Sequence, residues 1–241
     1  MGASGAPDFY YKEAQRLGYV ARSAFKLLQI QKHSNIIKSG SSVLDLGCAP
    51  GSWLQVACQS LGPLQHGGSV LGIDVKKVKV PPVHCDSRVH TIAADVMTLS
   101  KHQLRALSPK QKGFSVILSD MCPSVSGVTT KDAALSVELG MRALDLAVGS
   151  AASSVQASAD DDDYIREEQS VDDPSGSDDK GVLRVGGNLI IKLLESEDSK
   201  EISQICKPLF RKSSWLRPKA TRPSSREIYL ICQGLKPDAK T

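Results

Sequence analysis

The strongest constraint on the fold is the segment V-L-D-L-G-C-A-P-G-S-W, which spans residues 43–53. A short buried-strand pattern at residues 43–46 ends in Gly47, and apolar residues at helical spacing resume at residues 52–61. Gly47 and Gly51 can adopt positive φ angles and let a ligand approach the backbone without a Cβ in the way. The segment therefore predicts a strand, a tight turn and a helix N-terminus, which is where open parallel sheets bind their ligands.

A nucleotide-like cofactor suits such a turn. The loop has the spacing G-x-x-x-G, however, and lacks the third glycine of the dinucleotide fingerprint G-x-G-x-x-G. A nicotinamide-dependent dehydrogenase is therefore a weak alternative. Taken alone, the turn is equally consistent with an ordinary loop.

Apolar, β-branched runs alternate with helical patterns along most of the chain. This alternation is typical of an α/β, Rossmann-like fold with a doubly wound, mainly parallel sheet. The last strand follows its predecessor without a long crossover helix, which predicts one antiparallel strand near the C-terminus. The predicted strands are residues 43–46, 69–74, 89–93, 114–119, 188–193 and 227–232, and the predicted helices are residues 21–31, 52–61, 99–107, 131–148 and 199–210.

The chain has 241 residues, which suits a single domain at residues 1–241 with room for an insertion. The formal net charge is +4, but residues 151–181 hold ten acidic and two basic side chains, a net charge of −8. The rest of the chain therefore carries +12, which indicates a polyanionic partner, with solubility as the plainer explanation. Residues 151–181 are rich in Ser, Asp and Gly, and we expect a disordered acidic insertion there.

The cysteines give no sign of disulfides or of a metal site. The sequence has no C-x-x-C pair and no Cys/His cluster at metal-ligand spacing, so we expect reduced thiols of an intracellular protein and no bound metal. It also has no run of 18 apolar residues and no apolar segment of a secretory signal, so we expect no membrane association. The six cysteines are Cys48, Cys58, Cys85, Cys122, Cys206 and Cys232.

Acidic residues end the next two predicted strands. Asp74 ends S-V-L-G-I-D, and Asp95 ends T-I-A-A-D. An acid at the tip of the second strand is placed to accept hydrogen bonds from the ribose diol of a cofactor on the first turn. We expect Asp95 to meet an adenine amine. For each residue by itself, a role in a turn or a cap is the simpler explanation.

Four charged residues lie in segments that are far apart in the sequence. Asp120 ends the fourth strand in V-I-L-S-D, and Lys192 lies inside L-I-I-K-L-L, a pattern that otherwise indicates a fully buried strand. Lysine is rarely buried unless it is paired or functional, so Lys192 needs a partner or a function. Glu227 opens the last strand and Lys26 lies in the first predicted helix. Separately, each of these two is more simply a surface charge.

Together these segments carry a specific resemblance. The chain contains, in this order, S-A-F-K-L-L, D-L-G-C-A-P-G-S-W, L-S-D-M-C-P-S-V-S-G, I-I-K-L-L-E and S-R-E-I-Y-L-I. It resembles the FtsJ/RrmJ family of S-adenosylmethionine-dependent RNA ribose 2′-O-methyltransferases, apart from the acidic insertion and the termini. The resemblance implies a seven-stranded sheet of the class I methyltransferase type.

The resemblance also implies the site residues. The family has a catalytic Lys-Asp-Lys-Glu tetrad, which falls here on Lys26, Asp120, Lys192 and Glu227. Its positions for the S-adenosylmethionine cofactor fall on Gly51, Trp53, Asp74, Asp95 and Asp120, and Gly47 belongs to the same turn.

The residue types suit this chemistry. Methyl transfer from a sulfonium to a ribose hydroxyl requires the hydroxyl to lose its proton, and we expect Lys192 to be the base. A neighbouring cation such as Lys26 and partial burial would lower the pKa of Lys192, whereas the carboxylates of Asp120 and Glu227 would raise it. The sequence leaves the direction of this pKa open.

Basic residues flank the tetrad in the sequence, and we expect them to bind RNA phosphates without sequence preference. Tyrosines interleave with the first group and suit stacking on unpaired bases or, equally, ordinary helix packing. The basic residues are Lys12, Arg16, Arg22, Arg211, Lys212, Arg217, Lys219 and Arg222, and the tyrosines are Tyr10, Tyr11 and Tyr19.

The chain departs from the family pattern after the fourth strand. Where the family commonly has D-M-A-P-N, this chain has D-M-C-P-S, so Cys122 and Ser124 replace a small residue and an amide. The tetrad is unaffected, but the substrate contacts of that loop are in question. We interpret Cys122 as a packing residue, because a ribose hydroxyl acceptor needs no thiol nucleophile.

The resemblance implies a substrate in ribosomal RNA, with a large-subunit uridine as the leading expectation. A tRNA ribose methyltransferase is the nearest alternative, and a non-catalytic RNA-binding ribosome-assembly factor of the same fold is an alternative from another class. We expect a monomer that binds rRNA within a ribosomal subunit and does not bind DNA. Organellar members of the family favour the mitochondrion, with the cytoplasm or nucleus as alternatives because no transit peptide is visible.

Overall fold

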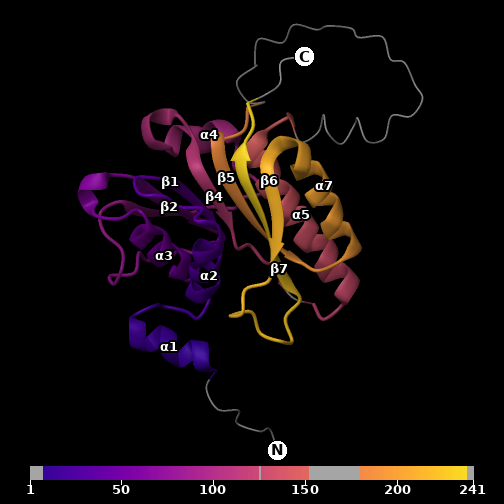
Figure 1. The fold of residues 1–241 in the computed structure, drawn as a ribbon, viewed down its shortest axis with the longest axis horizontal. Coiled ribbons are helices and arrows are strands. Elements are labelled where there is room, and N and C mark those ends of the chain that lie inside the picture. The colour runs from indigo at the N-terminus through magenta and orange to yellow at the C-terminus, as the bar shows by residue number, and fades with distance from the viewer. Residues whose placement is uncertain (1–7, 125, 152–179, 238–241) are drawn as a thin grey trace, which may run out of the picture.

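The computed structural model describes residues 8–124, 126–151 and 180–237. These residues form a seven-stranded sheet with helices on both faces (Figure 1). In chain order the elements are α1 (Phe9–Leu17), α2 (Ala24–Ser34), β1 (Ser42–Leu46), α3 (Ser52–Ser60), η1 (Leu64–His66), β2 (Ser69–Asp74), β3 (Val89–Ala93), α4 (Lys101–Leu107), η2 (Pro109–Gln111), β4 (Phe114–Ser119), α5 (Thr129–Val148), β5 (Leu183–Leu194), α7 (Glu197–Leu209), β6 (Phe210–Leu216) and β7 (Glu227–Leu235).

The strand order is β3-β2-β1-β4-β5-β7-β6. Strands β1 to β5 pair in parallel, and β7 runs antiparallel to both of its neighbours, β5 and β6. The prediction of a mainly parallel, doubly wound sheet with one antiparallel strand near the C-terminus is therefore confirmed. After β1 the chain winds outward to β3 and then returns to β4, which makes the carboxyl ends of β1 and β4 the ligand-binding edge of such a sheet.

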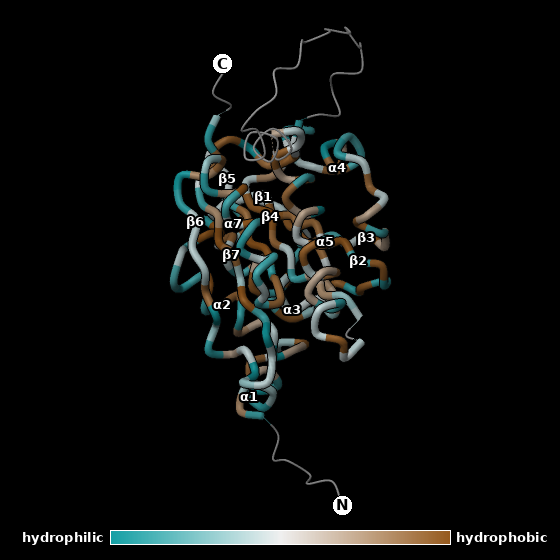
Figure 2. Tube along the Cα trace, turned by 90° about the vertical axis from the view of Figure 1, so that its right-hand side faces the viewer, coloured by the Kyte–Doolittle hydropathy of each residue, from teal (hydrophilic) through white to brown (hydrophobic). Residues whose placement is uncertain are grey.

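Each face of the sheet packs on its own group of helices. Leu44 and Leu46 of β1 join the apolar cluster under α4, α5 and α7, which includes Leu104 and Leu144. Val43 belongs to a second cluster with the apolar side chains of α2 and α3 on the other face. Figure 2 shows the hydrophobic residues along the central strands and the hydrophilic ones outside them. Burial on both faces explains why these strands appear in the sequence as unbroken apolar runs.

The sequence analysis missed β6 and assigned its first residue to a helix. The helix predicted at residues 199–210 is α7, which ends at Leu209, and Phe210 begins the strand. Among the described strands, β6 pairs with β7 alone, and its sequence F-R-K-S-S-W-L leaves many side chains exposed. A polar edge strand lacks the apolar run that marks the buried strands.

Helix α1 was also not predicted. Ala14 is its one buried residue, so no buried apolar run marks this helix in the sequence. Its ends nevertheless carry capping signals: Asp8 Oδ1 accepts a hydrogen bond from Tyr10 N at 3.0 Å, and Gly18 follows with a φ of 78°.

The acidic insertion predicted at residues 151–181 lies almost entirely outside the described residues, and its disorder stays a prediction. Gly149 and Lys180, on either side of that gap, form an isolated antiparallel bridge. Within the described part of the chain, no helix has the length and apolar character needed to cross a membrane.

Candidate active site

The turn after β1 is packed against the loop that follows β4. Gly47 has a φ of 78°, and a Cβ there would lie 2.9 Å from Met121 Cγ and 3.0 Å from the Met121 backbone nitrogen. Gly47 N donates to the carbonyl of Ile73 at 2.8 Å, and Asp120 N donates to that of Leu46 at 3.1 Å. Residue 47 must be glycine because the carboxyl ends of β1, β2 and β4 converge around it.

Gly51 and Trp53 lie at the start of α3 and stabilise the same turn. Gly51 is buried with a φ of 108°, and a Cβ there would lie 2.9 Å from Pro81 Cγ. Trp53 is 2% exposed, its Nε1 donates to the Ser23 carbonyl at 3.0 Å, and its ring centroid lies 5.8 Å from that of Tyr229. Both residues hold the turn and the start of α3, and their direct contact with a cofactor stays a prediction.

A cavity of about 430 Å³ opens beside this turn at the carboxyl edge of the sheet, and we call it the Gly47 cavity. Asp74 and Asp95 line it, where Asp74 Oδ2 accepts from Ala49 N at 3.0 Å and Asp95 Oδ1 accepts from Met97 N at 2.9 Å. Other lining residues include Val96, Met121, Leu139, Asp120 and Lys192. Four predicted cofactor residues, Gly47, Asp74, Asp95 and Asp120, therefore share one cavity.

Asp45, two residues before Gly47, is a fully buried carboxyl group on β1. Among the described residues, neither of its carboxylate oxygens has a hydrogen-bond partner. Burial raises the pKa of Asp45 well above its usual value, and the charges of Asp120 and Asp74 raise it further. The Asp45 carboxyl group therefore lies near other acidic groups and, in the described part of the chain, has no hydrogen-bonded cation. The sequence analysis assigned Asp45 no role, although one acid inside an apolar strand was a usable signal.

The four predicted catalytic side chains, which we call the tetrad, come together in the structure. Lys26 Nζ on α2 lies 2.6 Å from Glu227 Oε2 at the start of β7. Lys192 Nζ, near the end of β5, lies 3.1 Å from Asp120 Oδ1 and 3.8 Å from Glu227 Oε1. The result is a chain of alternating charges, Lys26, Glu227, Lys192 and Asp120.

Lys192 is 6% exposed, as its apolar neighbours in the sequence indicated. Burial lowers the pKa of Lys192, but the nearby carboxylates of Asp120 and Glu227 raise it more, and the net pKa lies above the usual value. Burial raises the pKa of Glu227, but Lys26 and Lys192 lower it to below its usual value. At neutral pH the Lys192 side chain is therefore an ammonium group that pairs with carboxylates.

Tyr229 is a site residue that the sequence analysis missed. Its hydroxyl donates to Asp120 Oδ1 at 2.8 Å, and its side chain is fully buried. Burial raises the pKa of Tyr229 well above its usual value, so the phenol stays protonated and acts as a donor. Tyr229 stands opposite Lys192 in the β5–β7 register. The motif S-R-E-I-Y-L-I contains it two residues after Glu227, which was the available signal.

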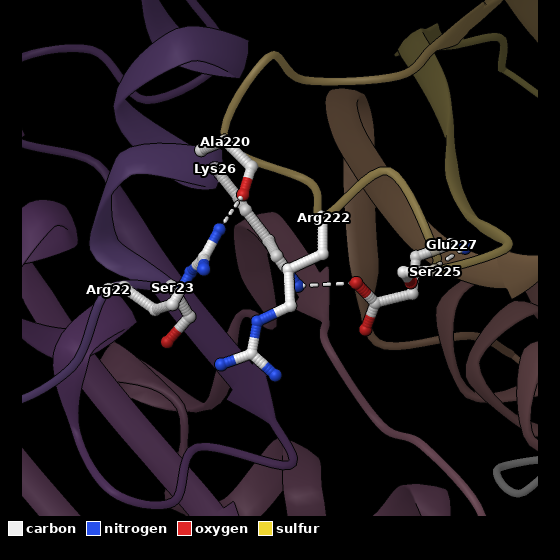
Figure 3. Close-up of a pocket in the computed structure, with 7 residues that line it drawn as sticks. All are labelled: Arg22, Ser23, Lys26, Ala220, Arg222, Ser225 and Glu227. Atoms are coloured by element: carbon white, nitrogen blue, oxygen red, sulfur yellow. Dashed lines mark hydrogen bonds and ion pairs between the residues drawn. The ribbon is translucent and has the colours of Figure 1, made fainter. Parts of the chain in front are cut away.

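A second pocket, of about 310 Å³, adjoins the tetrad, and we call it the Arg22 pocket. Figure 3 shows the side chains of Arg22 and Lys26 reaching it from the α2 side and those of Arg222 and Glu227 from the β6–β7 side. The loop between β6 and β7 is held on the segment just before α2, because Arg22 Nη2 donates to the Ala220 carbonyl at 2.7 Å.

The tetrad lies between the two openings. Asp120 and Lys192 line the Gly47 cavity, and Lys26 and Glu227 line the Arg22 pocket. The contact of 3.8 Å between Lys192 and Glu227 links the two pairs. A group placed at this contact is therefore accessible both from the Gly47 cavity and from the Arg22 pocket.

Four of the eight predicted RNA-binding residues make ion pairs or line a pocket in the structure. Arg16 pairs with Glu13, and Arg217 bonds the Ser225 carbonyl and lies 3.7 Å from Glu195. Arg22 and Arg222 line the Arg22 pocket. Every member of the group except Arg22 is exposed, and the members outside these contacts are Lys12, Arg211, Lys212 and Lys219.

The contacts of Tyr10 and Tyr19 favour a packing role over base stacking. The Tyr10 ring centroid lies 5.2 Å from that of Phe25, and Tyr19 OH donates to Gln59 Oε1 at 2.8 Å. Tyr11 is 50% exposed and keeps a face free for stacking.

Cys122 and Ser124 both line the Gly47 cavity. Burial raises the pKa of the Cys122 thiol, and Lys192 opposes that shift only in part, so the thiol is neutral. A neutral thiol agrees with the interpretation that Cys122 is no nucleophile. The interpretation of Cys122 as a packing residue is not met, because the residue is exposed and lines the cavity.

The strand order, the cavity at the carboxyl ends of β1 and β4, and the tetrad beside it define a class I methyltransferase. The match of a family model to residues 19–235 shows that the chain belongs to the FtsJ-like methyltransferase family. The family expected from the sequence is confirmed, and the nicotinamide alternative is wrong.

Curated relatives resemble the chain over most of its length. It is 32% identical over 226 residues to ribosomal RNA large subunit methyltransferase E of Desulfosudis oleivorans, covering 93% of this chain and 89% of that protein. It is 32% identical over 227 residues to the protein of the same name from Methanocaldococcus jannaschii, covering 94% and 78%. A crystal structure from Plasmodium falciparum described as a ribosomal RNA methyltransferase has the same fold, with a TM-score of 0.64, 22% identity and coverage of 90% and 98%.

Proposed function

We propose that this methyltransferase transfers a methyl group from S-adenosylmethionine to a ribose 2′-hydroxyl of ribosomal RNA, with a large-subunit uridine as the acceptor. The observation that carries the proposal is the position of the tetrad between the Gly47 cavity and the Arg22 pocket. This arrangement leaves room for a methyl donor on one side and a nucleotide on the other. The curated relatives named for large-subunit rRNA support the choice of RNA.

The residues of the Gly47 cavity fit S-adenosylmethionine. That cofactor carries an ammonium and a sulfonium cation, and the acidic side chains of Asp74, Asp95 and Asp120 line the cavity, with Asp45 buried under the turn. We assign Asp74 to the ribose diol and Asp95 to the adenine amine. When bound, the cofactor supplies an electrophilic methyl group on its sulfonium.

The tetrad then orients and deprotonates the acceptor. With the methyl donor in the Gly47 cavity, the ribose hydroxyl would pass its proton to the neutral amine of Lys192 as its oxygen accepts the methyl group. Asp120 and Glu227 hold Lys192 in place, and Lys26 fixes Glu227 from the other side. Because these carboxylates raise the Lys192 pKa, the reactive amine is a minority form at neutral pH. Holding the two reactants in line supplies much of the remaining rate.

Transfer of labelled methyl groups tests the proposal directly. Purified protein is incubated with labelled S-adenosylmethionine and with large-subunit rRNA, small-subunit rRNA or tRNA, and 2′-O-methylated positions are mapped. We expect label at a ribose of large-subunit rRNA, and none with the Lys192→Ala variant. Label on tRNA alone would replace this proposal with the tRNA alternative. Cofactor binding without label on any RNA would favour the non-catalytic assembly factor.

The ribosomal context has its own test. Comparing free large-subunit rRNA with assembled subunits as substrates shows which of them the enzyme accepts, and we propose the subunit. A monomeric state and a mitochondrial location also stay predictions, which light scattering and imaging of the tagged full chain would check.

A further inference from the structure

Two cationic side chains line the Arg22 pocket in addition to Lys26 of the tetrad. Lys26 is neutralised by Glu227 in the ion pair of 2.6 Å. The two other cations that line the pocket are Arg22 and Arg222, which come from opposite sides of it (Figure 3). Two guanidinium groups at one small opening repel each other, and an anion between them relieves that repulsion.

An internal anion already contacts both arginines. The Oδ2 atom of Asp8 pairs with Arg22 Nη1 and lies 3.9 Å from Arg222 Nε. Asp8 is the N-cap of α1, and its other oxygen accepts from Tyr10 N at 3.0 Å. One carboxylate oxygen therefore marks a point at which both arginines receive negative charge.

The guanidinium of Arg22 is held in advance of any ligand. Its Nη2 donates to the Ala220 carbonyl at 2.7 Å, and its central carbon lies 5.7 Å from the centroid of the Tyr10 ring. Burial lowers the pKa of Arg22, and the charge of Arg222 lowers it further. A preorganised, partly desolvated arginine binds an oxyanion strongly, because little side-chain entropy is lost on binding.

The position of the pocket limits what it can bind. The acceptor hydroxyl must reach Lys192, which lines the Gly47 cavity, so the rest of its nucleotide extends past Glu227 into the Arg22 pocket. The group attached to a ribose next to its 2′-hydroxyl is a phosphodiester.

We propose that Arg22 and Arg222 form a phosphate seat for the phosphodiester next to the target ribose, and that Asp8 fills this seat until RNA displaces it. The inference rests on the proposed RNA substrate. The seat positions the ribose at the tetrad, and the Asp8 carboxylate competes with the phosphate for the same two arginines.

Binding of a fluorescent single-stranded oligouridylate, without cofactor and at several salt concentrations, tests the seat independently of methyl transfer. We expect Arg222→Gln to weaken binding about tenfold and to reduce the salt dependence by about one released counterion. Arg184→Gln removes the same charge from the start of β5 at the opposite edge of the sheet, and we expect less than a twofold change. Equal losses in the two variants would overturn the seat.

A separate variant tests whether the Asp8 carboxylate competes with RNA. Asn is as good an N-cap as Asp, so Asp8→Asn keeps the bond to Tyr10 N while it removes the charge. We expect Asp8→Asn to strengthen binding of the oligouridylate severalfold, and unchanged or weaker binding would refute the role of Asp8. Thermal unfolding of each variant shows that it is folded, as expected for Arg222, which is 67% exposed.

Two small competitors identify the anion. Uridine 5′-monophosphate and uridine 3′-monophosphate should displace the oligouridylate from the wild-type protein better than uridine does, and this advantage should disappear in Arg222→Gln. If inorganic phosphate competes as well as the monophosphates, the assignment to an RNA phosphodiester is wrong. A protein that shows the seat but methylates no RNA would keep this inference and refute the proposed function, whereas methylation without the seat would do the reverse.

Discussion

Lys26 and Glu227 are 201 positions apart in the chain, and Lys26 Nζ lies 2.6 Å from Glu227 Oε2. The pair forms because the β6–β7 loop is attached to α2, where Ala220 N donates to Gln29 Oε1 at 3.0 Å and Ala220 O accepts from Arg22. This ion pair closes the side of the tetrad at which we propose that the acceptor ribose binds. The structure therefore links the second helix of the chain to its last strand at the point where the chemistry is proposed.

Replacing Lys192 by arginine separates its charge from its ability to accept a proton. The guanidinium keeps the pairing with Asp120 and Glu227 but is not deprotonated in proteins. We expect single-turnover methyl transfer to fall by at least about 100-fold, while cofactor affinity measured by calorimetry stays within severalfold of wild type. The matched control is Lys200→Arg, an exposed lysine on α7, which should keep full activity. Full activity of Lys192→Arg would exclude a proton-accepting role.

The raised pKa of Lys192 predicts how the rate depends on pH. Below that pKa the neutral amine fraction increases tenfold with each pH unit, so we expect the single-turnover rate to rise with a slope of about one in log units between about pH 7 and 9. The measurement uses saturating RNA and cofactor. A rate that is already constant across this range would show that deprotonation of Lys192 does not limit the reaction.

Glu227→Gln should destabilise the protein in a pH-dependent way. The folded state holds the pKa of Glu227 below 4.5, so its stabilising contribution is present above that pH and is lost as the pH falls through the folded pKa. We expect a loss of about 1–3 kcal/mol in the free energy of unfolding at pH 7, measured by urea, and convergence with wild type as the pH falls through the lowered pKa of Glu227. Glu197→Gln, which removes an exposed ion pair on α7, should change stability much less. A difference that persists undiminished in acid would mean that the pair with Lys26 is not its source.

Asp45→Asn tests the buried carboxyl under the turn. Because the folded state raises the Asp45 pKa, folding binds a proton and wild-type stability is lost as pH rises from the unfolded pKa near 4 toward the folded one. We expect the melting temperature of the variant to exceed that of wild type by a margin that grows between pH 5 and pH 8 in the absence of cofactor. Cofactor affinity should fall, because a bound cation favours ionisation of Asp45 and the variant has no carboxyl group to ionise. A margin independent of pH would show that Asp45 does not titrate as described.

Gly47→Ala should close the approach of the β4 loop to the turn. Its Cβ would lie 3.0 Å or less from Met121, whereas at Gly186, which also has a positive φ, no described heavy atom lies within 4 Å of the added Cβ. Gly186→Ala therefore reports backbone strain alone, about 1–2 kcal/mol, and Gly47→Ala should cost clearly more. Differential scanning calorimetry and cofactor titration measure both effects. Equal destabilisation by the two variants would show that the contact with Met121 has no consequence.

Most of the sheet and three of its site positions could be predicted from local sequence. Strands β1, β2 and β4 are buried on both faces, so their apolar runs stand out, and each ends in a residue that the parallel arrangement brings to one edge. Strand β6 and helix α1 could not be predicted from such runs, because β6 exposes many of its side chains and α1 buries Ala14 alone.

The sequence by itself determined the doubly wound topology, the turn at Gly47 and, through its motifs, the identities of the tetrad. Hydrophobic periodicity and glycine placement are local properties, so a linear chain displays them. Only the tertiary structure decided the direction of the Lys192 pKa, the bond from Tyr229 to Asp120 and the pairing of Asp8 with two arginines, since each depends on charges and burial contributed by segments far apart in the chain. Electrostatic interactions act through space, and the fold sets those distances.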